Sequence, residues 1–272
     1  MNSTKTPIPA IEDSSNLSHH FIAFNELVRI LRDECPWDRK QTHESISHLL
    51  IEEAYETADA ISKKNDDELS KELGDLLLHV VMHSRMAEQR GAFTLQDVIE
   101  KVFTRLVHRH PHVFGDTSVQ DENEVLQNWE ALKMKEGRKS VLEGVPAFLP
   151  ALLRAQRTQE KAANVGFDWD KKEDVWAKVE EEMFELKTEL MANDKKKAAD
   201  EFGDVLFSLV NAARFEGLVA EETLQATTKK FINRFQFIEE KAGLMNRKLS
   251  EMSLAEMDAL WNEAKQKEQA TL

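Results

Sequence analysis

Cysteine is almost missing from this chain, which has a single one, Cys35, among 272 residues. One cysteine excludes an internal disulfide and is typical of a reducing compartment, so we expect a cytoplasmic protein. Glycine and proline are also scarce, with nine and six residues respectively. Few residues that interrupt helices, in a chain rich in Glu, Lys, Leu and Ala, predict long helices.

Long apolar runs are lacking too, because none approaches the roughly 18 residues of a membrane span, and we expect no membrane partner. The net charge of −14 argues against duplex nucleic acid as the main partner, since phosphate binding draws on clustered Lys and Arg. An anionic small molecule can still bind if a cation mediates the contact. Residues 1–20 lack the apolar segment of a signal peptide, so we expect a flexible N-terminal arm.

One acidic pattern occurs twice in the chain. EExxE followed by ExxD spans residues 52–75 and recurs over 181–204, at a constant offset, since 181−52 and 204−75 both equal 129. Other residues keep the two copies in step: Lys101 and Arg105 against Lys230 and Arg234 at the same offset, and Trp129 and Lys133 against Trp261 and Lys265 at an offset of 132. A repeat of this length indicates duplicated domains.

The repeat therefore predicts two tandem helical-bundle domains. Residues 137–150 contain two Gly and two Pro, and we place the domain boundary there. The expected order is the arm (1–20), an N-terminal helical domain (21–137), a linker (138–150) and a C-terminal helical domain (151–272).

Helical spacing of apolar residues, without convincing period-two alternation, predicts an all-α fold. The expected helices cover residues 21–31, 43–62, 67–90, 95–108, 121–136, 174–192, 196–216 and 221–242, and a last one opens at the capping-box sequence 253–256 and runs through Trp261. Short polar turns near 63–66 and 193–194 join the two acidic helices of each domain, which are therefore expected to be antiparallel.

Acidic residues three apart lie on one face of a helix, as Glu182 and Glu185 do, and likewise Glu201 and Asp204. If the two helices are antiparallel neighbours, these four carboxylates converge and repel one another unless a cation compensates. Oxygen-only ligands suit a hard cation, so the pattern predicts a Mg²⁺ site in which Mn²⁺ can substitute. The first copy predicts an equivalent site from Glu53, Glu56, Glu72 and Asp75.

The alternative is a solvated acidic face, which describes most of the 50 acidic residues here. Two features argue against it. Asp75 and Asp204 lie inside apolar runs, and each follows a mid-helix glycine, Gly74 or Gly203, that costs roughly 1 kcal/mol relative to Ala. A glycine beside the acid in both copies predicts the close approach of a helix or ligand.

Cations and aromatics add to the acidic residues. Lys230 and Arg234, four apart on a helix, can clamp phosphate oxygens, although such a pair is more often a surface feature. Trp129 and Trp261 can stack on a base or belong to a core. Carboxylates for a metal, cations for phosphate and an aromatic for a base together predict a nucleotide site.

Histidines offer a competing site. His79 and His83 are four apart on the helix of Asp75, a geometry that can bind a transition metal. Ser208 and Ala212 replace them in the second copy, so they are not part of the repeated site.

The doubled EExxE and ExxD signatures in an all-α chain closely resemble the MazG nucleoside triphosphate pyrophosphohydrolases of bacteria. The resemblance covers residues 21–265 and includes three local strings: Cys35-Pro36-Trp37-Asp38, Arg109-His110-Pro111-His112-Val113-Phe114 and Asn164-Val165-Gly166-Phe167-Asp168-Trp169. It implies a homodimer of helical domains and Mg²⁺-dependent hydrolysis of a nucleoside triphosphate to the monophosphate and pyrophosphate.

By position, the resemblance implies roles in the C-terminal domain, the catalytic one in two-domain members. The metal ligands would be Glu182, Glu185, Glu201 and Asp204, and the nucleotide contacts would be Lys178, Glu181, Lys230, Arg234, Trp261 and Lys265. Glu181, next to a ligand, is our candidate for the group that accepts the proton of the attacking water.

The two copies differ at one suggestive position: Asn211 lies seven residues after Asp204, where the first copy has Met82. Asn211 can hydrogen-bond a sugar or base, so we expect the main site in the C-terminal domain. Whether the first copy is active stays open.

Rival functions remain at this point. A di-iron protein of the ferritin type needs Glu-x-x-His pairs, and no histidine here has a Glu three residues before it. A hydrolase narrow for one substrate, such as dUTP, and a nucleotide or metal sensor without activity both use the same ligands. A purely structural scaffold would need none of them.

Overall fold

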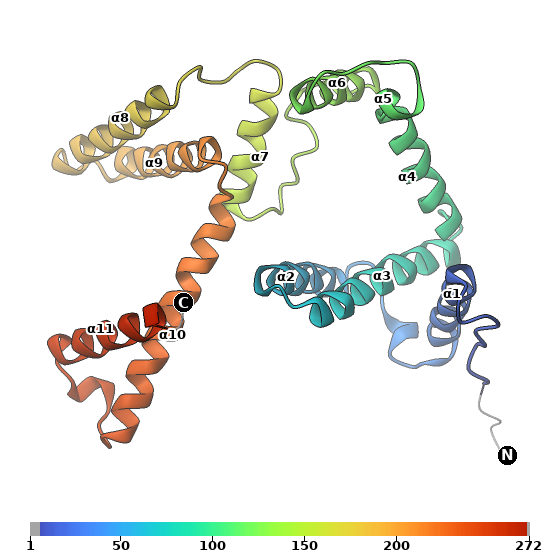
Figure 1. The fold of residues 1–272 in the computed structure, drawn as a ribbon, viewed down its shortest axis with the longest axis horizontal. Coiled ribbons are helices and arrows are strands. Elements are labelled where there is room, and N and C mark those ends of the chain that lie inside the picture. Colours follow the sequence, from blue (N-terminus) through green and yellow to red (C-terminus); the bar gives the residue numbers. More distant parts are fainter. Residues whose placement is uncertain (1–5, 271–272) are drawn as a thin grey trace. The chain divides into compact units, whose positions relative to one another are not determined.

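The computed structural model describes residues 6–270 and divides the chain into two compact units, Met1–Ser118 and Val119–Leu272. The described residues form helices and no strand, which confirms the expected all-α fold (Figure 1). None of these helices is long and apolar enough to cross a membrane. Part of the expected arm, residues 1–5, lies outside the described residues.

Unit 1 is built around one antiparallel helix pair. Helix α3 packs against α2 along its first half and against α1 near its end, and α4 leads away from it (Figure 1). The elements of this unit are α1 (Leu17–Glu34), η1 (Asp38–Lys40), α2 (Ser47–Lys63), α3 (Asp66–Gln89), α4 (Leu95–Arg109) and α5 (Pro111–Phe114).

Unit 2 repeats the pair with α8 and α9. Helix α7 packs across α9 as α1 does across α3, and α11 folds back along α10 (Figure 1). The elements of this unit are α6 (Glu122–Lys135), α7 (Ala151–Ala163), α8 (Lys172–Met191), α9 (Lys195–Phe215), α10 (Ala220–Leu244), η2 (Leu249–Glu251) and α11 (Leu254–Ala270).

The turns that close the two helix pairs are built alike. Lys64 and Asn193 adopt left-handed backbone conformations, with φ of 53° and 57°, which end α2 and α8. The next residue of each turn then caps the following helix: Asn65 Oδ1 accepts from Glu68 N at 3.3 Å, and Asp194 Oδ1 accepts from Lys197 N at 3.1 Å. These short capped turns make the paired helices antiparallel, as expected.

The cores of the two units differ in character. Unit 1 buries a continuous apolar cluster of Val28, Ile46, Val81, Met82 and Met86 between α1, α2 and α3. Unit 2 divides its buried apolar residues into two smaller clusters, one around Val175, Val179 and Ala212 and one around Leu186, Ala198 and Val205. The space between α7, α8 and α9 is therefore less completely filled with apolar side chains than its counterpart in unit 1.

Some element bounds differ from the sequence-based expectations. Helix α1 begins at Leu17, inside the expected arm, and α7 was not among the expected helices. The capping box at Ser253 and Glu256 forms, with reciprocal bonds of 3.3 and 2.7 Å to the backbone, and α11 extends to Ala270.

The expected linker is tied to α7 by a buried ammonium group. Lys161 Nζ donates to Val141 O at 3.0 Å and to Glu143 O at 3.3 Å, and it lies 3.7 Å from Glu130 Oε2 of α6. Both Lys161 and Glu130 are buried. Helix α6 consequently belongs to unit 2, and the division between the units lies upstream of the boundary predicted at 138–150.

Candidate active site

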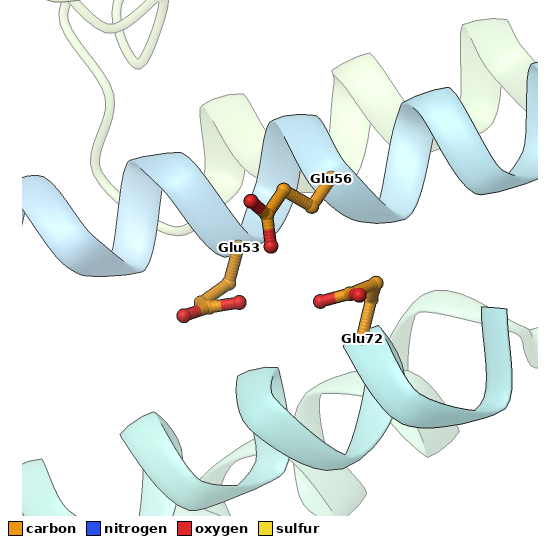
Figure 2. A group of neighbouring side chains, drawn as sticks. All are labelled: Glu53, Glu56 and Glu72. Atoms are coloured by element: carbon orange, nitrogen blue, oxygen red, sulfur yellow. The ribbon is translucent and has the colours of Figure 1, made fainter. Parts of the chain in front are cut away.

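The repeated acids converge between the paired helices of both units. In unit 2, one carboxylate oxygen each from Glu182 and Glu185 of α8 and Glu201 of α9 lie within 4.8 Å of one another. In unit 1 the same holds for Glu53, Glu56 and Glu72, which point toward one another from α2 and α3 (Figure 2). Antiparallel pairing thus assembles each carboxylate trio from two segments of sequence.

Asp204 and Asp75 stand next to these trios. The pKa of Glu201 is raised first by desolvation and then by the charges of Glu185 and Asp204. Desolvation is likewise the largest cause that raises the pKa of Glu53, followed by the charge of Asp75. Both aspartates are therefore close enough to act electrostatically on their trios, although they are not members of them.

Repulsion within the trios shows that they suit a cation. The charge of Glu72 is the largest cause that raises the pKa of Glu56, and Glu72 Oε2 is buried without a hydrogen-bond partner. Glu53, Glu56 and Glu201 have raised pKa values, and oxygen ligands that disfavour their own ionised form are the chemistry that a hard divalent cation compensates. The residues present thus fit such an ion in both units.

Lysine already neutralises part of each trio. Lys178 Nζ lies 2.8 Å from Glu182 Oε1 and 2.9 Å from Glu181 Oε1 on the same helix face. The hydrogen bond with Glu182 is the largest cause that raises the pKa of Lys178. In unit 1, Lys71 Nζ donates to Glu72 Oε1 at 2.8 Å, and this bond is the main cause that lowers the pKa of Glu72.

A cavity of about 610 Å³ opens beside the unit 2 trio, between α7, α8, α9 and the 166–169 loop. Glu182, Asp204 and Lys178 make its wall polar and charged where it meets the trio. Most other parts of the wall are apolar or amide-bearing, with Leu142, Gln159, Ala162, Phe167, Trp169, Val175, Phe207 and Asn211, and the ion pair of Asp168 and Arg214 also lines it. A ligand with a charged end and a flat, partly apolar end matches this division.

Asn211, which was predicted from the comparison of the two copies, lines this cavity. Its side chain is hydrogen-bonded to Arg214, a residue that the sequence analysis did not identify. Arg214 Nε and Nη2 donate to Asn211 Oδ1 at 3.0 and 2.8 Å. The same guanidinium forms a two-pronged pair with Asp168, at 2.5 and 3.0 Å. Arg214 had a detectable signal, because Arg85 stands 129 residues before it.

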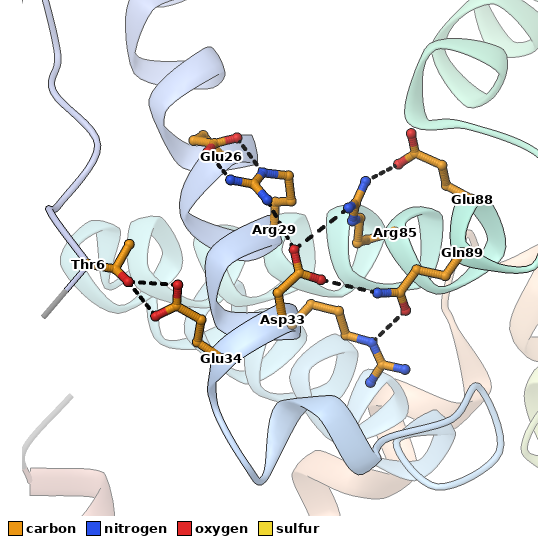
Figure 3. A network of polar contacts seen from close by, with 9 residues as sticks. Thr6, Glu26, Arg29, Asp33, Glu34, Arg85, Glu88 and Gln89 are labelled. Carbon is orange, nitrogen blue, oxygen red and sulfur yellow. Dashed lines mark hydrogen bonds and ion pairs between the residues drawn. The ribbon is translucent and has the colours of Figure 1, made fainter. Parts of the chain in front are cut away.

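Arg85 shows how differently unit 1 uses the equivalent position. Its Nη1 donates to Glu88 at 2.7 Å and its Nη2 lies 3.9 Å from Asp33 of α1 (Figure 3). Met82, the counterpart of Asn211, is buried in the apolar cluster. Unit 1 therefore keeps the carboxylate trio but fills with apolar side chains the position from which Asn211 faces the cavity in unit 2.

The predicted residues of α10 and α11 lie together, away from the walls of the cavity. Arg234 bonds Glu268 at 2.7 and 2.9 Å and lies over the Trp261 ring at 5.3 Å. Lys230 and Lys265 are exposed on the same two helices. None of these four lines the cavity within the described chain. Of their counterparts, Lys101 and Arg105 lie on α4 in unit 1, and Trp129 and Lys133 on α6 in unit 2.

The two glycines do not provide the close helix packing that was one of the two expected explanations. A Cβ atom added at Gly74 or at Gly203 would meet no atom within 4 Å among the described residues. Packing within this chain therefore does not require either glycine. The other expected explanation, approach of a ligand, remains.

The two histidines of α3 gain a third member in the structure. His43 Nδ1 lies 2.8 Å from His83 Nδ1 with the rings stacked, and His79 stacks on His83 at 5.9 Å. Among the described residues, the trios of carboxylates qualify as groups able to hold a metal ion, and this histidine group does not. The transition-metal geometry that the spacing of His79 and His83 allows is thus not completed by a third ligand among the described residues.

Comparison with known proteins gives one family. Residues 41–114 and 171–236, which contain both acidic patterns, match the MazG nucleotide pyrophosphohydrolase domain. The chain is 45% identical over 255 residues to the nucleoside triphosphate pyrophosphohydrolase/pyrophosphatase MazG of Thermotoga maritima, covering 90% of this chain and 96% of that protein. It is 38% identical over 256 residues to the nucleoside triphosphate pyrophosphohydrolase of Escherichia coli K12, covering 89% and 95%.

A third relative is longer. The uncharacterized protein YabN of Bacillus subtilis is 47% identical over 273 residues, a match that covers 98% of this chain and 56% of YabN.

Proposed function

Because this chain belongs to the MazG family of nucleotide pyrophosphohydrolases, we propose that it hydrolyses nucleoside triphosphates to the monophosphate and pyrophosphate in the unit 2 cavity. The observation that carries this proposal is the position of the carboxylate trio, which adjoins a cavity whose other walls are mostly apolar and amide-bearing. A triphosphate on its cation belongs at the charged end and the nucleoside at the other.

The proposed cofactor is Mg²⁺, with Mn²⁺ as a substitute. The donor set consists of carboxylate oxygens from Glu182, Glu185, Glu201 and Asp204, which is the ligand type that both ions prefer. When bound, such an ion neutralises phosphate charge and makes a coordinated water more acidic.

The side chains around the trio have distinct proposed roles. Lys178, an ammonium group in the cavity wall, would bind phosphate oxygens. Glu181 is exposed and, among residues 6–270, is hydrogen-bonded only to Lys178, so we propose it as the group that accepts the proton of an attacking water. Electrostatic stabilisation of the phosphoryl charge is then shared between these groups and the trio.

We place the main site in unit 2 and not in unit 1. Both units have a trio, so both are candidate cation sites. Unit 1 has Leu49 and Met82 at the positions of Lys178 and Asn211, and both side chains pack in its apolar core. Those residues offer neither a phosphate contact nor a hydrogen bond to a nucleoside.

A homodimer is part of the proposal, supported by an apolar face that occurs in both units. Eight exposed apolar residues of unit 1 recur in unit 2 at the offset of 129, and each is at least 36% exposed. This repeated apolar face comprises Tyr55, Ile61, Leu73, Leu77, Val80, Val102, Phe103 and Leu106, matched by Phe184, Leu190, Phe202, Leu206, Leu209, Phe231, Ile232 and Phe235. Exposed apolar patches of this kind mark association surfaces.

A partner chain also gives Lys230, Arg234, Trp261 and Lys265 a way to reach nucleotide. They do not line the cavity of their own chain, so their proposed contacts with the substrate require either a partner copy or a movement of α10 and α11. The proposed localisation is cytoplasmic, where nucleoside triphosphates are made and used.

The proposed specificity is broad, as suits removal of unwanted nucleotides. There are two alternatives: an enzyme with narrow specificity, of the dUTPase kind, and a nucleotide or metal sensor that has no hydrolytic activity. The test is incubation of the purified chain with a panel of ribo- and deoxyribonucleoside triphosphates, with Mg²⁺, with Mn²⁺ and without metal, and separation of the products. Monophosphate and pyrophosphate from several bases would support the proposal, and diphosphate with phosphate would refute it.

Matched variants locate the site. Glu182→Gln and Glu53→Gln change equivalent carboxylates of the two trios with little change in shape. We expect Glu182→Gln to lower kcat at least about 100-fold, the upper end of what loss of a partner of a metal ligand costs, and Glu53→Gln to keep most of the activity. Equal losses would contradict the assignment to unit 2.

A further inference from the structure

The amide of Gln159 is held in one orientation inside the cavity of unit 2. Its Nε2 donates to Phe207 O, a backbone carbonyl of α9, at 2.9 Å. A carbonyl can only accept, so the nitrogen must face Phe207 and the oxygen must face away. Gln159 is 8% exposed, and its Oε1 is buried without a hydrogen-bond partner. A buried acceptor without a donor is costly, which calls for a ligand that supplies one.

The amide of Asn211 is held the opposite way round, with its oxygen bonded to the protein and its nitrogen left for a ligand. Its Oδ1 accepts two bonds from Arg214, at 3.0 and 2.8 Å, and a guanidinium can only donate. Asp168 fixes the guanidinium from the other side. The Nδ2 of Asn211 must therefore face away from Arg214, and it makes no hydrogen bond within residues 6–270.

The two amides lie close together on the cavity wall. Phe207, which holds Gln159, precedes Asn211 by four residues and thus stands one helical turn before it on α9. Both Gln159 and Asn211 line the same cavity. The wall consequently offers an acceptor from one amide and N–H donors from the other, and both are fixed in orientation before any ligand arrives.

We propose that Gln159 and Asn211 read the hydrogen-bonding edge of the nucleobase, with Gln159 Oε1 accepting from an N–H group of the base and Asn211 Nδ2 donating to an adjacent carbonyl oxygen or ring nitrogen. This inference rests on the proposed function of the same cavity. It makes Gln159 and Asn211 specificity-determining residues, with Arg214 and Asp168 as positioning residues.

The surroundings select a base and not a phosphate for this position. Both amides are neutral, and a fixed oxygen acceptor would repel a phosphate oxygen. Phe167 and Trp169, which line the same cavity, are 82% and 45% exposed and provide flat apolar surface for a base. The carboxylates and Lys178 that suit a metal-bound triphosphate lie elsewhere on the wall.

A base that is methylated on its edge is the sharpest probe. Uridine triphosphate has an N–H and a carbonyl side by side, and its 3-methyl derivative lacks the N–H. We expect wild-type protein to have a KM at least about ten-fold lower for the unmodified nucleotide, because the derivative leaves a buried acceptor unpaired. Gln159→Met, which keeps the length of the side chain, should remove most of that preference. A purely steric preference would survive the substitution.

Asn211→Asp tests the donor. The carboxylate still accepts from Arg214 but presents a second acceptor in place of the N–H group, so KM for unmodified nucleoside triphosphates should rise about ten-fold or more. Inhibition by inorganic tripolyphosphate, which has no base, should stay unchanged in both variants. Gln225→Glu, an exposed amide-to-acid change on α10, is the matched control and should behave as wild type.

The outcomes separate the two proposals. If wild-type protein hydrolyses no nucleoside triphosphate, the proposed function fails. If it hydrolyses them, and Gln159→Met and Asn211→Asp leave KM and the preference against 3-methyluridine triphosphate unchanged, then only the base-reading inference is overturned. Folding of each variant is checked by its melting temperature.

Discussion

Lys178 and Glu182, one helical turn apart on α8, form an ion pair of 2.8 Å at the point where the carboxylate trio meets the cavity. The ammonium group of Lys178 thus pairs with a carboxylate that we propose as a metal ligand. We therefore expect lysine and cation to compete for Glu182 while no nucleotide is bound, and the lysine to move toward phosphate when a cation takes its place.

Lys178→Met is expected to separate these two roles. Without the ammonium group, Glu182 is no longer neutralised, so Mg²⁺ should bind the nucleotide-free protein about three- to ten-fold more tightly. KM for nucleoside triphosphates should nevertheless rise, because a phosphate contact is lost. Calorimetric titration with Mg²⁺ and steady-state kinetics measure the two effects, and weaker Mg²⁺ binding in this variant would contradict the competition.

Glu201→Gln should raise the stability of the metal-free protein and reduce the stability that the protein gains from Mg²⁺. A carboxyl whose pKa is raised on folding stabilises the protein below its ordinary pKa of 4.5, and that contribution is lost as the pH rises through the raised value. At pH 7 the metal-free wild type therefore bears the cost of desolvating the ionised Glu201 carboxylate beside Glu185 and Asp204. We expect a higher Tm for metal-free Glu201→Gln at pH 7 and a smaller increase on adding Mg²⁺.

The control for this prediction is pH itself. At pH 4 the carboxyl of wild-type Glu201 is largely protonated, so the advantage of Glu201→Gln in melting temperature should shrink. An advantage that is equal at pH 4 and pH 7 would mean that charge repulsion is not its cause.

Gly203→Ala should stabilise the folded protein and also lower its catalytic activity. Alanine is favoured over glycine inside a helix by about 1 kcal/mol, and the added methyl group meets nothing within 4 Å. The free energy of unfolding of the nucleotide-free protein should therefore rise by up to that amount. Because we infer that a ligand approaches here, kcat/KM should fall several-fold, whereas Gly74→Ala should stabilise with little loss of activity.

Leu209→Glu tests the repeated apolar face. This residue of α9 is 41% exposed and matches Val80 of unit 1. A charge there should dissociate the proposed dimer, which light scattering after size-exclusion chromatography measures directly. Leu254→Glu is the matched control, since Leu254 is 80% exposed on α11 but lies outside the repeated face. A wild-type monomer would remove the dimer from the proposal.

Patterns local in sequence predicted much of this protein. The spacing of acids and the short turns were sufficient for the antiparallel pairs and for the trio of Glu182, Glu185 and Glu201, because helix periodicity and a two-residue turn leave few other arrangements. Asn211 followed from a difference between two copies of one pattern. The all-α class followed from helical spacing, and the family from the resemblance of the doubled acidic signatures to a known family.

Other features depend on contacts that no short pattern encodes. Gln159 lies on α7, a helix too polar to be recognised by its apolar spacing, and its importance comes from a bond to Phe207, 48 residues away. Lys161, a lysine in a polar stretch, gave no sign that it would be buried against the 138–150 segment. Gly74 and Gly203 were recognised as unusual, but only coordinates exclude packing within the chain as their cause.

The short capped turn between α8 and α9 also has a consequence for how the protein folds. Glu182 and Glu201 are separated by only 19 residues, so bringing the carboxylates together closes a small loop and costs little chain entropy. Contacts so local in sequence form fast. The cation site of each unit is therefore expected to assemble as soon as its helical hairpin is free of the ribosome, without waiting for α10 and α11 to pack, and a bound ion can stabilise the nascent chain at this early point.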